Sequence, residues 1–482
     1  MIYNPDPEGV KTRGNIWLIA TGVVLALSLA WWIFSGPKMA LQISEPGMDN
    51  RGKGNLLSEV VRIGEFFERF ITAEPAFEET WPRFRGEHFD NIRQPGLPLI
   101  DEFAGDDPRI QWTVQLGEGH AGPAIYKGLV YVLDYDEEQK ADMLRCFSLK
   151  DGKEVWRRWY NVNIRRNHGM SRTVPAVTEK YILTIGPRAH VMCVDRLTGD
   201  LLWGLNVESD YEADIPFWYT GQCPLIYEDK AIIATGGRAL LIAVDCATGE
   251  ILWETPNTNG LKMSHASIMP WTYNGVNMFV YSAVGGVVGI AADGPDEGKI
   301  LWESLKWGCS VVAPSPVCMP DGKLFLTAGY GSGSMVFQLS GTRGNFSLEQ
   351  LYEYKPNEGL ASEQQTPIVY GGMVYGILPK DGGPLRNQFI CVNPGDFRNV
   401  VWSSGKTHRF GLGPFMIADD KFFILNDDGT LTIARPGKTE FMLLDQIKVF
   451  EGQDAWAPLA IADGYLLLRD DQKMVCMDIR KR

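Results

Sequence analysis

Six polar or aromatic side chains stand at, or just before, short apolar segments that are expected to begin strands. They are His168, Arg172, His265, Gln364, Arg409 and Trp456. Arginine and histidine can donate charge-assisted hydrogen bonds to an oxyanion, and tryptophan can stack on a flat ligand. The competing interpretation is that such residues only bind water and cap strand ends. The chemistry indicated is anion binding, provided that the fold brings these side chains together.

No sequence pattern indicates catalysis at these residues. The chain has no G-x-S-x-G elbow, no H-E-x-x-H, no P-loop and no C-x-x-C-H haem attachment. The glycine-rich segment Ala328–Ser334 is followed by MVFQL, a strand pattern, which favours a tight turn over a phosphate-binding loop. None of the eight cysteines has C-x-x-C spacing, so a zinc site is poorly supported. We therefore predict no catalytic residue and no metal ligand.

A repeated phrase supplies the elements that would position the six side chains. It is an apolar strand, a small polar turn and two apolar residues before tryptophan, as in DRLTGDLLW and DCATGEILW. The tryptophans of this pattern, with Trp112 as an orphan copy, are Trp112, Trp156, Trp203, Trp253, Trp302 and Trp402. The first five are 44, 47, 50 and 49 residues apart. A period in the forties, with about four short strands per unit, is that of a β-propeller blade.

Eight blade starts lie between residues 109 and 482, which predicts an all-β, eight-bladed propeller. The last unit, from Ala455, is too short for four strands, so the strand around Trp112 is expected to complete it and close the ring. Each repeat tryptophan is expected to pack between neighbouring blades. The first strand of each blade lines the channel, which would bring the six candidate residues to one mouth.

Four of the eight cysteines occupy the same position of the repeat in different blades. They are Cys146, Cys193, Cys391 and Cys476, and at this position small buried residues are expected and disulfides are not. The disulfide state of the other four cysteines stays open at this point. They are Cys223, Cys246, Cys309 and Cys318.

The first 108 residues divide into a tail (1–15), an uncharged segment (16–34) and a linker (35–108). The uncharged segment is long enough to span a bilayer, and we predict a transmembrane anchor. The alternative is a cleaved signal peptide, but Phe34 stands where a small residue would be required. Lys11 and Arg13 weakly favour a cytoplasmic N-terminus.

Within the linker, apolar residues recur every three or four positions between residues 55 and 77, which predicts a short amphipathic helix. That helix would pack on its own chain or on the bilayer, or would bind a partner. The segment WPRFRG follows at Trp81–Gly86.

The D-x-x-T-G-x-x-x-W phrases resemble the repeats of the pyrroloquinoline quinone (PQQ)-like eight-bladed propellers, which include quinoprotein alcohol dehydrogenases and the BamB assembly lipoproteins. WPRFRG and the segment SEQQTPIVYGG are similar to bacterial envelope proteins with PQQ-binding-like repeats. The quinoprotein resemblance implies PQQ and Ca²⁺ at the channel mouth. However, those enzymes carry adjacent cysteines beside the quinone and longer loops, and no two cysteines are adjacent here.

These observations lead to one functional expectation and one alternative. We expect a membrane-anchored propeller in the bacterial envelope, outside the cytoplasmic membrane, that acts as a non-catalytic scaffold or accessory subunit for other membrane proteins. No cofactor is expected. The alternative is an oxidoreductase that uses PQQ and Ca²⁺. The net charge of −13 makes nucleic acid a poor partner.

Overall fold

The computed structural model describes residues 19–29, 31, 61–72, 77–452 and 454–481. The chain forms two compact units, residues 1–60 and 61–482. In the first unit, residues 19–29 and 31 are helical. Over the described ranges, no helix is both long enough and apolar enough to cross a membrane. The predicted anchor at 16–34 is therefore not confirmed, and both of its ends lie outside the described residues.

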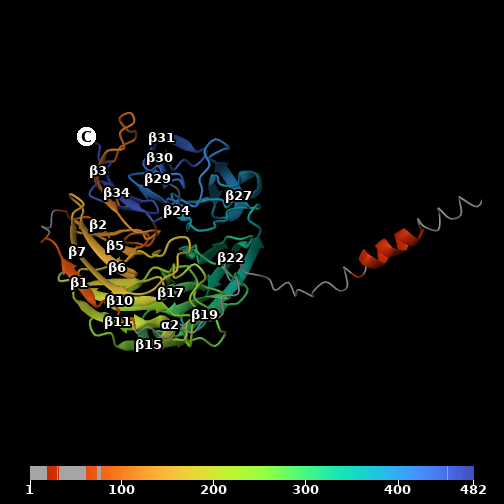
Figure 1. The fold of residues 1–482 in the computed structure, drawn as a ribbon, viewed down its shortest axis with the longest axis horizontal. Helices are drawn as coiled ribbons and strands as arrows, with labels where there is room; N and C mark the ends of the chain where they lie inside the picture. The colour runs from red at the N-terminus through yellow and green to blue at the C-terminus, as the bar shows by residue number, and fades with distance from the viewer. Residues whose placement is uncertain (1–18, 30, 32–60, 73–76, 453, 482) are drawn as a thin grey trace, which may run out of the picture. The chain divides into compact units, whose positions relative to one another are not determined.

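The second unit consists of eight antiparallel sheets arranged around a central axis (Figure 1). Blade 1 contains β4 (Ala124–Tyr126), β5 (Leu129–Asp136), β6 (Ala141–Ser148) and β7 (Glu154–Asn161), and blade 2 contains β8 (Ala176–Val177), β9 (Tyr181–Ile185), β10 (His190–Asp195) and β11 (Leu201–Asn206). Blade 3 contains β12 (Leu225–Tyr227), β13 (Lys230–Ala234), β14 (Ala239–Asp245) and β15 (Ile251–Pro256), and blade 4 contains β16 (Met269–Tyr273), β17 (Val276–Ala283), β18 (Gly286–Ala291) and β19 (Ile300–Ser304).

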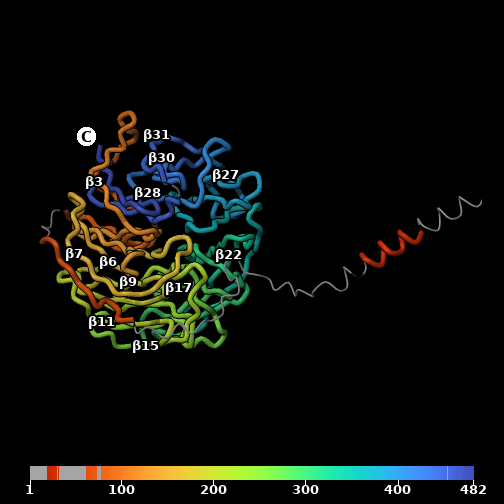
Figure 2. Tube along the Cα trace, viewed as in Figure 1, coloured from red at the N-terminus to blue at the C-terminus, as the bar shows by residue number. Residues whose placement is uncertain are grey.

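Blades 5 to 8 continue the ring (Figure 2). Blade 5 contains β20 (Val317–Cys318), β21 (Lys323–Ala328), β22 (Gly333–Ser340) and β23 (Ser347–Tyr354), and blade 6 contains β24 (Ile368–Tyr370), β25 (Met373–Ile377), β26 (Phe389–Asn393) and β27 (Asp396–Ser403). Blade 7 contains β28 (Phe415–Ala418), β29 (Lys421–Leu425), β30 (Thr430–Arg435) and β31 (Met442–Lys448), and blade 8 contains β32 (Ala460–Ala462), β33 (Tyr465–Arg469) and β34 (Lys473–Asp478) together with β3 (Ile110–Gln115). Short helical turns are α2 (Val207–Asp210), η1 (Gly294–Asp296) and η2 (Gly383–Leu385).

The N-terminal strand closes the ring, as the sequence predicted. In the eighth sheet the strand order is β3-β34-β33-β32, so β3 is the outer strand of the last blade. Trp112 on β3 is opposite Cys476 on β34. The eight-bladed propeller is thus confirmed, and its closure ties residues near 110 to the C-terminus.

The repeat tryptophans fit because a small residue stands opposite each of them on the neighbouring strand. These pairs are Cys146 with Trp156, Cys193 with Trp203, Ala243 with Trp253, Gly289 with Trp302, Cys391 with Trp402, and Cys476 with Trp112. A small side chain leaves room for the indole to lie over it. The four cysteines of this slot are buried and free, and so are Cys223 and Cys246, whereas Cys309 and Cys318 are free and half-buried.

Several of these indoles also reach the next blade. The Nε1 of Trp112 donates to the Leu149 carbonyl and that of Trp203 to the Cys246 carbonyl, at 2.8 and 3.0 Å. A Cβ placed on the turn glycine Gly249 would lie 2.7 Å from Trp203. Trp302 differs, because its Nε1 points to the sulfur of Met278 within its own blade. The repeated glycine is therefore needed both for its positive φ and for its bare Cα above the indole of the preceding blade.

The predicted amphipathic helix at 55–77 is wrong for its described part. Phe66–Arg69 form strand β1, which pairs antiparallel with the outer strand β7 of blade 1. Successive side chains of this extended segment point to opposite faces, so Phe66 stacks on Trp159 and Phe67 packs near Trp156. The backbone groups of β7 gain partners in this way, which a helix could not provide. Residues 55–60 and 73–76 lie outside the described residues.

Candidate functional site

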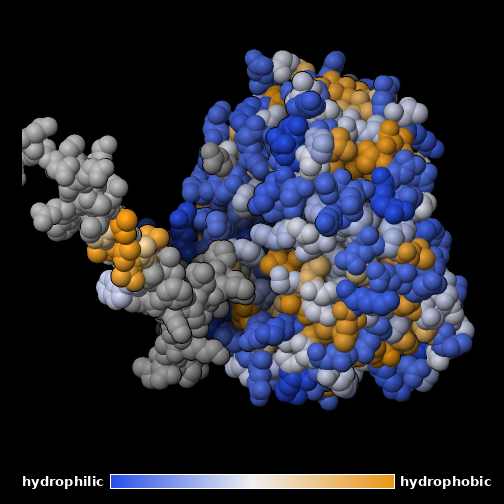
Figure 3. Space-filling view, turned by 90° about the vertical axis from the view of Figure 1, so that its right-hand side faces the viewer, coloured by the Kyte–Doolittle hydropathy of each residue, from blue (hydrophilic) through white to orange (hydrophobic). Residues whose placement is uncertain are grey.

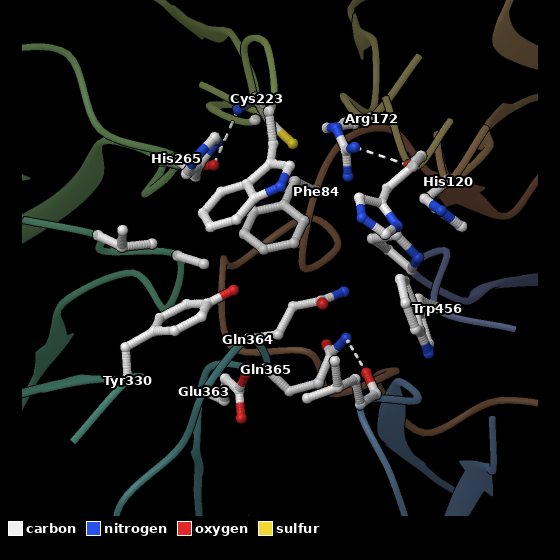
Figure 4. A pocket seen from close by; sticks show the side chains of 18 of the residues that line it. Phe84, His120, Arg172, Cys223, His265, Tyr330, Glu363, Gln364, Gln365 and Trp456 are labelled. Atoms are coloured by element: carbon white, nitrogen blue, oxygen red, sulfur yellow. Dashed lines mark hydrogen bonds between the residues drawn. The ribbon is translucent and has the colours of Figure 1, made fainter. Parts of the chain in front are cut away.

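A cavity of about 390 Å³ opens at one mouth of the propeller channel, where the loops that precede the innermost strands converge (Figure 4). Five of the six sequence-predicted residues line it: His168, Arg172, His265, Gln364 and Trp456. Arg409 does not line it, because its guanidinium bonds to the carbonyl of Arg386 and its backbone pairs with Gln388. The loop before blade 7 therefore directs Arg409 to the surface, and Leu412 lines the cavity instead.

Arg172 holds one wall of the cavity together. Its Nη2 donates to three carbonyls of the preceding loop, those of Asn167, His168 and Gly169, at 2.9, 2.7 and 3.2 Å. Burial lowers the pKa of Arg172 to about 10, so the side chain remains a cation at neutral pH.

Two carboxylates could serve as partners for Arg172, namely Glu118, whose charge acts on it, and Glu363, which lines the same cavity, but both already have other cationic partners. Glu118 pairs with Arg166 at 2.5 Å, and Glu363 pairs with Lys380 at 3.7 Å. Arg172 is thus a cation at the cavity wall whose neighbouring carboxylates are engaged elsewhere.

Two histidines of the cavity are neutral at pH 7. Burial, followed by the charge of Arg172, lowers the pKa of His265 to about 4. Burial and the charges of Arg172 and Arg469 lower the pKa of His120 to about 3. A neutral imidazole has one donor and one acceptor nitrogen, so both rings can orient a ligand without adding charge.

Aromatic side chains form the remaining walls. Trp218 stacks on Tyr330, with ring centroids 5.6 Å apart and an interplanar angle of 15°, and His120 packs against Trp456 at 4.9 Å. Tyr330 and Trp456 lie on opposite sides of the cavity (Figure 4). The sequence reasoning missed both Trp218 and Tyr330. Trp218 precedes the innermost strand β12 in the β11–β12 connection but belongs to no repeated pattern, and Tyr330 comes from the β21–β22 hairpin loop, away from the innermost strands.

The N-terminal segment supplies the residue at the centre of the ring, Phe84 (Figure 4). This segment runs across the ends of the innermost strands that are opposite to the cavity mouth: Thr80 pairs with Tyr126, the last residue of β4, and Val177 of β8 donates to the Pro82 carbonyl.

The neighbouring Arg85 fixes this segment. It is buried and donates to the carbonyls of Phe89, Asp90, Thr366 and Pro367. The channel is therefore filled from one side by WPRFRG, and the cavity is the part that remains open on the other side.

The donor set does not fit a calcium-bound quinone. Ca²⁺ takes six to eight oxygen ligands, whereas Glu363 is the only carboxylate among the lining residues and is paired with Lys380. Within the described ranges, no group of three or more His, Cys, Asp and Glu side chains could hold a metal ion. Cys223 is the one lining cysteine, and it is free. We therefore derive no reaction step that involves PQQ or a metal.

Comparison of the sequence with models of known protein families shows the family of this chain. A model described as outer membrane protein assembly factor BamB matches residues 102–215 and 139–402. The chain belongs to this family. No curated protein matches it in sequence.

Solved structures share the fold. BamB from Moraxella catarrhalis is similar with a TM-score of 0.51 and 12% identity, covering 76% of this chain and 99% of that one. The quinohemoprotein alcohol dehydrogenase of Comamonas testosteroni gives 0.55 and 13%, covering 85% and 82%. A europium-containing methanol dehydrogenase gives 0.55 and 14%, covering 82% and 90%. At these identities the likeness extends to the propeller architecture and not to a shared site.

Proposed function

We propose that this BamB-family propeller is a non-catalytic scaffold, an accessory subunit of a membrane protein complex in the bacterial envelope. In this proposal the segment 16–34 anchors the chain in the cytoplasmic membrane and the propeller lies on the periplasmic side. The family relationship, the apolar anchor segment and the absence of a metal-ligating cluster among the described residues support it.

The observation that carries the proposal is the pairing of β1 with β7. The outer edge of blade 1, strand β7, is covered by a short segment of the same chain that pairs with it as an added strand. Phe66 and Phe67 of β1 lie on tryptophans of β7, so the contact combines ladder hydrogen bonds with aromatic packing. Strand addition to an exposed edge is a common way in which proteins bind one another.

Among the described residues, other outer strands end their sheets without such a cover and expose apolar side chains. Leu252 on β15 is 46% exposed, and Leu351 on β23, Val401 on β27 and Leu443 on β31 are exposed as well. Apolar patches are visible between polar areas on the side of the propeller seen in Figure 3. Soluble proteins usually protect such edges with charges or covers, so exposed apolar edges mark surfaces for partners.

The experiment places lysine on these edges. The tagged full chain is purified from membranes in mild detergent as wild type and as the double variant Leu252→Lys, Leu443→Lys. We expect the variant to lose its co-purifying membrane proteins while its melting temperature is unchanged. The matched control is Leu197→Lys, since Leu197 is 67% exposed but lies in a turn outside any strand. Equal recovery of the same partners with all three proteins would contradict docking at the edges.

Two further measurements test the rest of the proposal. Protease added to spheroplasts should digest the propeller, and protection would reverse the proposed topology. Addition of PQQ with Ca²⁺ should give no dye-linked alcohol oxidation. Turnover in that assay would replace the scaffold proposal with the oxidoreductase alternative.

A further inference from the structure

We propose that the cavity at the channel mouth binds a small planar organic oxyanion, a ring compound with a carboxylate, which Arg172 holds without a metal. This site does not depend on the scaffold role. It follows from the charge, the unsatisfied polar atoms and the backbone of the loops around the cavity.

The charge of the cavity has the opposite sign to that of the protein. The charged lining residues are Arg172, Lys380 and Glu363, and the last two form an ion pair, which leaves the cation of Arg172. The whole chain carries a net charge of −13. Arg172 is half-buried, and the only carboxylate whose charge acts on it among the described residues, Glu118, is already paired with Arg166. An anionic ligand would give this cation an ion-pair partner of its own.

The polar atoms around Arg172 do not form a complete structural network. Among the described residues, the guanidinium makes hydrogen bonds only through Nη2. In the described part of the chain, its Nε and the Nδ1 of His120 are buried without a hydrogen-bond partner, and so is the Oγ of the adjacent Ser171, which does not itself line the cavity. His120 and Ser171 are only 6% and 1% exposed. If these residues served merely to cap strand ends, their polar atoms would be paired, as most buried polar groups are.

The loops of the cavity also hold bulky residues in an unfavourable backbone conformation. His168, Tyr219 and Tyr330 have φ values of 52°, 68° and 58°, in the left-handed region that favours glycine. Such a conformation is unfavourable for a residue with a side chain, and such conformations cluster at ligand sites. At Tyr330, the strained backbone holds an aromatic ring that is 56% exposed over the cavity mouth, stacked on Trp218.

The shape of the cavity specifies the rest of the ligand. A volume of about 390 Å³ is at the lower end of the range for small-molecule pockets, which suits a compound of about two fused rings. Tyr330 and Trp456 on opposite sides can contact the faces of such a ring system, and Phe84 limits its depth. The neutral imidazoles of His120 and His265 can bond to the carboxylate or a ring substituent.

The test uses 2-naphthoate as the probe and 2-naphthamide as its neutral isostere. Both are titrated into the purified full chain by isothermal titration calorimetry at pH 7, without added metal. We expect 2-naphthoate to bind about tenfold or more tightly than 2-naphthamide, because only the carboxylate makes a charge-assisted bond with Arg172. Equal affinity for the two compounds, or no binding of either, would overturn the proposal.

Three variants locate the binding. Arg172→Gln should weaken 2-naphthoate by about tenfold or more and leave 2-naphthamide unchanged. Because Arg172 also ties the Asn167–Gly169 loop, Tyr330→Ala provides a second variant at an exposed position, and it should weaken both compounds. The control Arg409→Gln removes a cation outside the cavity and should change neither affinity. If Arg409→Gln had the same effect as Arg172→Gln, or if Tyr330→Ala had none, binding would lie elsewhere. These results leave the edge-strand experiment unaffected.

Discussion

Asp142 should make the propeller less stable as the pH rises. This residue of β6 is buried at the interface between blades 1 and 2, where its Oδ2 accepts a hydrogen bond from Tyr160 at 2.6 Å and its Oδ1 has no partner. Burial raises the pKa of Asp142 to about 7, even though the Tyr160 hydrogen bond lowers it. The carboxyl group is therefore neutral in the folded protein under mildly acidic conditions.

The size of the effect follows from the difference between the folded and unfolded pKa. Because the folded pKa is raised, the contribution to stability is complete below the unfolded value of about 4 and is lost as the pH rises through about 7. A difference of about three units at about 1.4 kcal/mol each amounts to about 4 kcal/mol. Asp142→Asn keeps the acceptor for Tyr160 and removes the titration.

The assay is urea unfolding of wild type and Asp142→Asn at several pH values between 4 and 8. We expect similar free energies of unfolding near pH 4 and a growing advantage for the variant up to about pH 7. Asp478→Asn serves as the control of opposite sign, because the Arg480 hydrogen bond and nearby cations lower the pKa of Asp478 to about 2, so this variant should be less stable than wild type at pH 7. Parallel profiles for wild type and Asp142→Asn over the whole range would refute the reasoning.

Three other predictions concern the packing of the blades. Gly249→Ala should lose about 1–3 kcal/mol more than Gly275→Ala, because both glycines have similar positive φ (76° and 73°) but only the Cβ at Gly249 would meet Trp203; equal melting temperatures would contradict this. Trp156→Ala should lower the free energy of unfolding by about 3–5 kcal/mol, since the ring is 1% exposed, and a loss below about 1 kcal/mol in urea titration would be inconsistent with its burial. Phe67→Asp should release β1 from β7 and speed hydrogen exchange at β7 amides, whereas unchanged protection would show that β1 does not cover that edge.

The sequence predicted the ring and its closure because these depend on a local pattern that recurs. Trp203 and Gly249 are parts of the same repeated phrase, and each copy packs against the next. The candidate cavity was only partly predictable. Arg172 and His265 precede innermost strands and reach the cavity, whereas Arg409 occupies a comparable position, yet its loop turns it toward Arg386.

The residues that sequence reasoning missed come from segments without periodicity. Tyr330 lies in a hairpin loop and Phe84 in the segment that crosses the channel, and nothing in their spacing relates them to the cavity. The sequence around Phe66–Arg69 predicts a helix because apolar residues recur there every three or four positions, yet these four residues form a strand. The segment is extended because it pairs with the edge of β7, and that edge exists only in the folded propeller.

The closure of the ring by β3 sets a time scale for making the protein. Gln115 pairs with Lys473, so the last blade cannot be completed until about 360 further residues have left the ribosome. At about 5–20 residues per second, this takes roughly 20–70 s. During this interval β3, with Trp112, has no sheet to join, whereas each of the other blades is complete as soon as its own four consecutive strands have been synthesised. A cell that produces this chain must keep one apolar strand from pairing with other molecules for most of the period of synthesis.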